Sequence, residues 1–332
     1  MSFDCTKREA IKRYILEKIY QKDDFISKTV QAFGVSRTTA YKYVNSLANE
    51  GLIRLDSDGK YSIRNAEPKE YEYENKGLSE ARIYKDVLFD AVADLPENAQ
   101  DIWKYAFTEI ANNAIEHSKA EHLRITVSKN ALFTEVLVCD DGIGIFKGIS
   151  DYYGMTDADD AVFALFKGKL TTDPQRHSGE GIFFVSKAMD YFRISSQGKS
   201  FFVSRHGDDP QCMEVSDEAR GTIVAIILFN ATVLDLKDVF DAYTTECSFD
   251  KTVVPVRFVS TSGQPISRSE ARRLCFGLDK FKVAVLDFKG VRTIGQGFAH
   301  ELFSVFAKKH EELKIECLNM SPDVERAIKH VL

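Results

Sequence analysis

The chain has few of the residues that build metal sites or disulfide frameworks. Its 332 residues include 6 Cys, 7 Pro and 1 Trp. The cysteines are scattered, with no C-x-x-C pair and no histidine at metal-ligand spacing, so neither a zinc site nor a disulfide scaffold is expected. We interpret them as reduced thiols, with Cys139 inside an apolar strand as the clearest case.

Long apolar runs are also missing. The opening residues MSFDCTKREAIKRY have no apolar signal-peptide core, and no later stretch reaches the roughly 18 apolar residues of a membrane span. We therefore expect a cytoplasmic protein with no membrane partner. A hydrophobic fraction of 44% and a charged fraction of 28% are typical of folded globular proteins, and the length suggests two or three domains.

Charge is distributed unevenly along the chain. The formal net charge is -6, but residues 1–65 hold 12 Lys or Arg against 8 Asp or Glu, a net of +4 that leaves about -10 for the rest. A basic end on an acidic body suggests that only the first part of the chain meets nucleic acid.

The first segment predicts three helices and a hairpin. KREAIKRYILEKIYQ places isoleucines on one helical face, and a second short helix over about 24–33 ends at Gly34. Ser36 can cap a third helix. The stretch LIRLDSDGKYSI then predicts two short strands joined by an Asp-Gly turn.

This order resembles the winged helix-turn-helix family over residues 7–65. The resemblance implies that the third helix enters the major groove of DNA near its N-terminus. The side chains facing base edges and phosphates would be Arg37, Thr38, Tyr41, Lys42 and Asn45, and wing residues Arg54 and Lys60 would add backbone contacts. The alternative is a dimerisation or docking module, because some winged helices serve that purpose.

The middle segment opens with a strongly periodic helix over residues 99–117, AQDIWKYAFTEIANNAIEH. Glu109 and Asn113 lie one turn apart on the same face of it. Beside a triphosphate, the carboxylate can activate an attacking hydroxyl and the amide oxygen can bind Mg²⁺. By itself, the same pair is also what a solvated helix face shows.

Further motifs follow in order. Two alternating strands run into DDGIGI, where Asp140 precedes Gly142 and Gly144. The carboxylate can accept a hydrogen bond from the exocyclic amine of adenine, and the glycines allow the backbone to approach a flat ring closely.

Two more glycines stand before a helical run in HSGEGI, namely Gly179 and Gly181. N–H groups exposed there can bind phosphate oxygens, and the helix dipole also favours anions. Thr222, in Arg-Gly-Thr, opens the strand TIVAIILF.

The series E-x-x-x-N, D-x-G-x-G, G-x-G and G-T over residues 109–222 resembles the GHKL (Bergerat-fold) superfamily of ATP-binding domains. The resemblance implies ATP and Mg²⁺ as cofactors, with Glu109 as general base, Asn113 as the Mg²⁺ ligand and Asp140 as the residue that reads adenine. The implied ATP-binding residues are Asn113, Asp140, Gly142, Gly144, Gly179, Gly181, Thr222, Lys167 and Arg176. The last two belong to a lid expected over residues 147–176, in which Lys169 is a further candidate for the γ-phosphate.

Within the superfamily, the compact arrangement most resembles the anti-sigma-factor serine kinases. The first histidine of the chain is His117, inside the Glu/Asn helix, so the upstream phosphoacceptor helix of sensor histidine kinases is missing. Only about 110 residues follow the pocket motifs, which is too short for the transducer domain of gyrase-like or Hsp90-like members.

The last segment alternates β-α-β-α-β-α, and VLDFKGV followed by IGQGF over residues 285–298 resembles the STAS fold of anti-sigma-factor antagonists. That family carries its phosphorylated serine at the start of this helix, where the chain has Gly295, Gln296 and Gly297. Phosphorylation at those positions is therefore excluded. We expect the domain to mediate contacts with the ATP domain or with a protein partner.

These interpretations predict a multi-domain α/β (α+β) protein with four regions. They are a winged helix-turn-helix domain at residues 1–66, a linker and the start of the ATP domain at 67–98, a GHKL ATP-binding sandwich at 99–230 and a STAS-like domain at 231–332. The expected function is an ATP-binding transcriptional or signalling regulator that controls the winged helix. The alternative is a protein serine/threonine kinase acting on a separate partner. By analogy we expect a homodimer.

Overall fold

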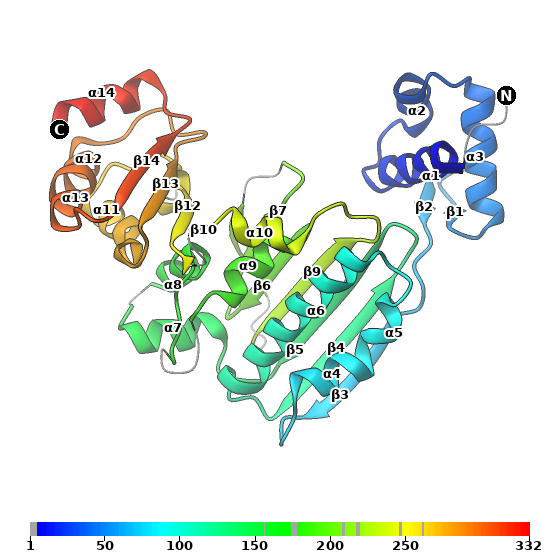
Figure 1. The fold of residues 1–332 in the computed structure, drawn as a ribbon, viewed down its shortest axis with the longest axis horizontal. Coiled ribbons are helices and arrows are strands. Elements are labelled where there is room, and N and C mark those ends of the chain that lie inside the picture. The colour runs from blue at the N-terminus through cyan, green and yellow to red at the C-terminus, as the bar shows by residue number, and fades with distance from the viewer. Residues whose placement is uncertain are drawn as a thin grey trace.

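The computed structural model of the chain describes residues 5–155, 157–173, 178–207, 210–216, 220–245, 248–260 and 262–332. It is a mixed α/β protein whose three parts Figure 1 distinguishes by colour. We call them the N-terminal unit (residues 5–64), the central domain (residues 69–249) and the C-terminal domain (residues 250–332). Among the described residues, no helix combines the length and the apolar character needed to cross a bilayer.

The N-terminal unit has the three helices and the hairpin that the sequence predicts. Its elements are α1 (Cys5–Tyr20), α2 (Phe25–Phe33), α3 (Arg37–Asn49), β1 (Ile53–Leu55) and β2 (Tyr61–Ile63). Local signals set the helix boundaries. The Asp24 carboxylate caps α2, Gly34 ends it in the left-handed conformation, and the Ser36 hydroxyl accepts a hydrogen bond from the Thr39 N–H at the start of α3.

The central domain is built on a seven-stranded antiparallel sheet with the strand order β3-β4-β5-β9-β6-β7-β8. The strands are β3 (Lys69–Glu74), β4 (His122–Lys129), β5 (Phe133–Asp140), β6 (Tyr191–Ser196), β7 (Lys199–Ser204), β8 (Gln211–Glu214) and β9 (Ile223–Phe229). Burial alternates along β4, β5 and β9, because successive side chains of a strand point to opposite faces of the sheet.

Helices cover one face of this sheet, and Figure 1 shows α4, α5 and α6 in front of β3, β4, β5 and β9. The helices of the domain are α4 (Glu80–Val87), α5 (Phe89–Val92), α6 (Glu97–Asn112), α7 (Ile145–Tyr153), α8 (Ala158–Lys167), α9 (Gly181–Ala188) and α10 (Leu236–Asp241). The helix predicted over 99–117 is α6 followed directly by a π-helical turn, η1 (Asn113–His117). α6 packs against α9 and the sheet, so it lies in the middle of the helical layer.

Two segments at the expected domain borders belong to the central domain by packing. Strand β3, inside the region expected to hold a linker, pairs with β4 along its whole length. Residues 236–249, expected in the last domain, bury aromatic rings against the helical layer. The Phe240 ring lies 5.2 Å from that of Tyr105, and the Phe249 ring lies 4.8 Å from that of Phe183. The packing border therefore falls near residue 250.

The C-terminal domain contains the β-α-β-α-β-α alternation that the sequence predicts, on a three-stranded parallel sheet in the order β12-β13-β14. Its strands are β12 (Lys251–Pro255), β13 (Val283–Asp287) and β14 (Lys314–Leu318); its longer helices are α11 (Arg268–Cys275) and α14 (Pro322–Val331). Between β13 and β14, α12 (Gln296–Ala299), a π-helical stretch η4 (His300–Phe306) and α13 (Ala307–Lys309) form one continuous helix. The first strand ends at Pro255, earlier than the run VVPVRFVS suggests, because proline offers no N–H to a sheet.

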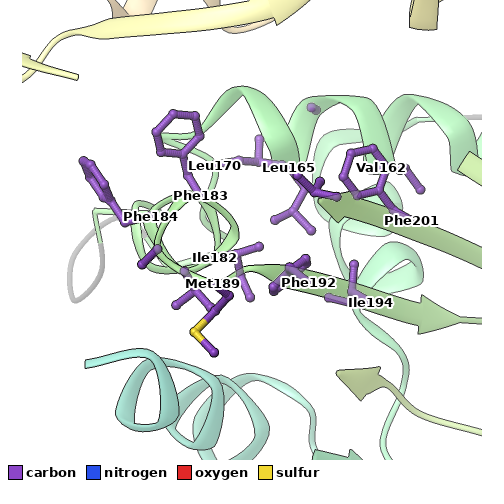
Figure 2. Packing of buried hydrophobic residues seen from close by; sticks show 14 of the residues in the cluster. Val162, Leu165, Leu170, Ile182, Phe183, Phe184, Met189, Phe192, Ile194 and Phe201 are labelled. Atoms are coloured by element: carbon purple, nitrogen blue, oxygen red, sulfur yellow. The ribbon is translucent and has the colours of Figure 1, made fainter. Parts of the chain in front are cut away.

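The hydrophobic core has two clusters. The larger one runs through the central and C-terminal domains, and Figure 2 shows the part where Leu165 and Leu170 approach Ile182 and Ile194. The smaller one joins the N-terminal unit to the sheet, with the Tyr20 ring 5.2 Å from that of Phe133. The N-terminal unit is therefore docked where β5 begins and β9 ends.

Replacing Phe133 with alanine should loosen this docking. Phe133 is 8% exposed, and the loss of a buried ring typically costs about 3–5 kcal/mol. We expect faster amide hydrogen exchange throughout α1, α2 and α3 in Phe133→Ala. Phe89→Ala, which removes a ring that is 51% exposed, should leave that exchange unchanged and serves as the control. Equal protection of these helices in both variants would contradict the docking role.

Candidate functional site

A cavity of about 280 Å³ lies in the central domain where β5 ends and β9 begins. It brings together segments that are far apart in the sequence. Among the residues singled out by the sequence motifs, its lining includes Glu109, Asn113, Asp140, Gly144, Gly179, Gly181 and Thr222. Gly142 is not part of the lining, but it adjoins Asp140 through a hydrogen bond.

Asp140 is the most electrostatically unusual of these residues. It is the last residue of β5 and is only 9% exposed. Its Oδ1 accepts hydrogen bonds from the Gly142 N–H at 2.9 Å and the Thr222 N–H at 3.3 Å. Burial nevertheless raises the pKa of Asp140 to about 6, because desolvation outweighs these bonds. The cavity therefore holds an acceptor that is costly to keep charged.

The pairing of β5 with β9 places a glycine directly against this aspartate. Gly221 has φ +90°, and a Cβ there would lie 1.9 Å from the Asp140 carbonyl oxygen. No side chain fits in that space, and an L-residue would also be strained at this φ. The next residue, Thr222, turns its hydroxyl oxygen toward the start of α7, where it accepts the Ile145 N–H at 3.0 Å. Gly221 thus sets the position of Thr222 beside Asp140.

Glu109 of α6 and Asn113 of η1 also line the cavity. The Glu109 carboxylate lies against the first residue of α9, because a Cβ on Gly181 would be 2.1 Å from its Oε2. Any group bound at the N-terminus of α9 would therefore meet this carboxylate. The π-helical turn that begins at Asn113 also brings His117 into the lining; π-helical turns are often found at functional sites.

Several lining residues were not singled out by the sequence motifs. They are Asn112, His117, Ser118, Ser178, Thr171 and Thr172, with Leu165 and Leu170 as apolar neighbours. His117 had a usable signal, since it stands four residues after Asn113 as Asn113 stands after Glu109. Thr171 and Thr172 belong to the stretch 147–176 that is expected to form a lid, but no motif marks either residue.

Lys167 and Lys169, two of the basic residues expected near a γ-phosphate, do not line the cavity. Lys167 is 3% exposed, does not line the cavity, and donates from its Nζ to carbonyl oxygens of the C-terminal domain. Lys169 donates to the Lys280 carbonyl oxygen at 2.8 Å. Arg176 lies outside the described residues. We therefore leave both lysines out of the candidate site.

The residues predicted to face DNA share the exposed side of α3. Arg37, Thr38, Tyr41, Lys42 and Asn45 are all exposed, whereas Ala40, Val44 and Leu47 are buried. In the hairpin, the two cations expected to contact the DNA backbone, Arg54 and Lys60, are each close to a carboxylate. Arg54 forms an ion pair with Asp56 at 3.1 Å and Lys60 with Asp58 at 3.2 Å. Its two cations are thus paired with carboxylates of the same hairpin.

Asp140 and its neighbour Asp141 should respond in opposite ways to the same substitution. A carboxyl group with a pKa raised on folding stabilises the fold below its unfolded value and loses that contribution as the pH rises through the folded value. From 3.8 to about 6, the shift corresponds to roughly 3 kcal/mol at most. Asp140→Asn should therefore raise the free energy of unfolding above pH 7, with a gain that shrinks toward pH 4.

Asp141→Asn is the matched control. The pKa of Asp141 is lowered by hydrogen bonds from His122, whose N–H donates at 3.0 Å and whose ring lies 2.9 Å away. Its carboxylate stabilises the fold above the unfolded pKa, so Asp141→Asn should lower the free energy of unfolding at pH 7. Urea unfolding between pH 4 and pH 8 measures both variants. A loss of stability in Asp140→Asn at pH 8 would show that the charged Asp140 carboxylate does not destabilise the fold.

Comparison with known proteins identifies one part of the chain. A family model described as a STAS-like domain of unknown function (DUF4325) matches residues 270–325, the stretch from α11 into α14. No curated protein matches the chain. The C-terminal domain is therefore STAS-like.

Proposed function

We propose that the central domain binds an adenine nucleotide with Mg²⁺ and that the bound state controls the attachment of the N-terminal unit to DNA. The observation that carries the proposal is the convergence of four separate motifs, spread over residues 109–222, on one cavity. These motifs place a buried carboxylate, an amide, a second carboxylate and two glycines at the start of α9 around the same cavity.

The residues fit the chemical groups of such a ligand. Asp140 offers a buried acceptor suited to the exocyclic amine of adenine. The N-terminus of α9, preceded by Gly179, suits phosphate oxygens. The amide oxygen of Asn113 is a ligand type that Mg²⁺ accepts, and bound Mg²⁺ would neutralise phosphate charge there.

Nucleotide binding can be tested by calorimetry with ATP and Mg²⁺. Asp140→Asn should weaken binding by about 10- to 100-fold, because its NH₂ group meets the adenine amine with a donor instead of an acceptor. Asn113→Ala should remove most of the dependence of affinity on Mg²⁺. Asp141→Asn changes the adjacent carboxylate, which is absent from the cavity lining, and should bind normally. A wild-type chain that binds no adenine nucleotide would overturn the proposal.

Attachment to DNA rests on the exposed face of α3. Its basic and polar side chains stand clear of the core, and the unit is docked on the central sheet. Mixed-sequence duplex DNA, titrated at several salt concentrations with and without ATP, tests the proposal. Lys42→Ala should weaken binding and reduce the slope of log affinity against log salt by about one.

Lys28→Ala is the control for that substitution. Lys28 is on α2 and forms an ion pair with Asp23 at 2.6 Å. Its loss should leave the salt slope unchanged. Equal slopes for Lys42→Ala and wild type would favour the alternative in which the N-terminal unit is a protein docking module. An affinity for DNA that is the same in apo, ADP and ATP states would remove the regulatory link.

A second candidate function is transfer of the γ-phosphate to a serine or threonine of a separate protein. The observation in its favour is the position of Glu109, whose carboxylate lies against the first residue of α9, where phosphates would bind. Such a carboxylate can orient or deprotonate an attacking hydroxyl. Wild-type chain incubated with γ-labelled ATP and cellular protein should then label a protein, and Glu109→Gln should bind ATP without labelling.

A further inference from the structure

The segment between α7 and α9 has one side on the cavity and the other on the C-terminal domain. We call residues 157–173 the lid segment; it consists of α8 and the chain that follows it. Leu165, Leu170 and Thr171 line the cavity from this segment. Leu170 also fits closely against the glycine loop before α9, because a Cβ on Gly179 would lie 2.5 Å from its backbone. The lid segment is therefore a wall of the proposed nucleotide site.

Lys167, at the end of α8, crosses to the C-terminal domain. Its Nζ donates to the carbonyl oxygens of Arg273 at 3.1 Å and Leu274 at 3.2 Å, and also to that of Phe276. These carbonyls are at the C-terminus of α11, where helical carbonyls lack intrahelical partners and the helix dipole favours a cation. One ammonium thus caps the end of a helix from another domain.

Contacts on both sides of Lys167 extend this junction. The Thr252 hydroxyl donates to the Lys167 carbonyl oxygen at 2.8 Å. Lys169 and Lys280 each donate from Nζ to the backbone carbonyl of the other, at 2.8 and 2.9 Å. At the opposite end of α8, the Arg273 guanidinium pairs with Asp157 at 3.0 Å and with Asp160. The C-terminal domain therefore contacts both ends of α8.

The free-energy cost of burying the Lys167 ammonium acts against these contacts. Desolvation lowers the pKa of Lys167 to about 7, although Asp160 and the carbonyls of α11 favour the protonated form. If the two domains separated, water would solvate the ammonium again, and this hydration free energy would offset part of the loss of the hydrogen bonds. The buried ammonium of Lys167 therefore adds less to the stability of the junction than its three hydrogen bonds alone suggest.

We propose that the STAS-like domain is an intramolecular clamp on the lid segment, so that its docking preforms the wall at Leu170–Thr172 and strengthens nucleotide binding. The inference rests on the proposed function of the cavity. Because linkage is reciprocal, a bound nucleotide strengthens the docking of the STAS-like domain by the same factor. The Lys167 and Lys169 ammonium groups then act on the nucleotide only indirectly, by positioning the segment.

Adjacent arginines on α11 provide a matched test. Arg273 reaches across to the lid segment, whereas Arg272 pairs with Glu301 of its own domain at 2.8 Å. Arg273→Ala should weaken ATP binding by about tenfold, within the range usual for coupled sites. Arg272→Ala should change it by less than about twofold. Lys167→Met should act in the same direction as Arg273→Ala.

Hydrogen exchange on the same full-length chains supplies a second readout. In the wild type, ATP should slow amide exchange in α11, which does not line the cavity, and Arg273→Ala should reduce this slowing. If Lys167→Met fails to fold, Arg273→Ala carries the test alone. Equal ATP affinities for Arg273→Ala and Arg272→Ala would overturn the clamp while leaving the proposed function intact. Absence of ATP binding in the wild type would overturn both.

Discussion

The antiparallel pairing of β5 with β9 is the constraint on which most of the molecule depends. In this register Phe133 faces Phe229 at one end, and Cys139 faces Ile223 at the other. One end of the pair therefore supplies the platform for the N-terminal unit, and the other places Thr222 beside Asp140. A slip by one residue would turn both sets of side chains to the opposite face of the sheet. The cavity and the docking platform are consequently products of a single register.

This arrangement limits how the cavity can influence the N-terminal unit. β5 has 8 residues, about 27 Å of extended chain at roughly 3.4 Å per residue, and it is paired on both sides. A central strand cannot shift its register without breaking hydrogen bonds to both neighbours. A signal from the cavity could therefore pass along β5 only if the pairing of the whole sheet changed. The lid segment is a more direct link, because it lies outside the sheet, lines the cavity and is joined to the C-terminal domain by Lys167 and Arg273. Regulation of DNA attachment would then involve how the C-terminal domain and the N-terminal unit are placed around a rigid sheet.

Sequence reasoning predicted those features that short-range chemistry encodes. Gly34 ends α2 through its left-handed backbone, Ser36 caps α3 through its hydroxyl, and the period of α6 identifies the helix that carries Glu109. Features made by long-range packing were harder to predict. The sequence of β3 suggests a polar linker because its tyrosines alternate with glutamates, yet those tyrosines pack on the core. The surroundings of Lys167 could not be predicted, because its acceptors are backbone carbonyls more than 100 residues away, and any sequence provides carbonyls.

Two buried charges are costly to keep, one in the cavity and one in the lid segment. Asp140 lines the cavity and has a raised pKa, whereas Lys167 belongs to the lid segment, faces the C-terminal domain and has a lowered pKa, so burial disfavours the charged form of each. Replacing either by an apolar residue would avoid this cost, and a chain selected for stability alone has little reason to keep both. A ligand that gives Asp140 a donor offsets the first cost, while docking of the STAS-like domain offsets the second. In the proposed clamp, the lid segment lines the cavity and also contacts the STAS-like domain, so the free energies of the two events would be coupled, as a switch requires.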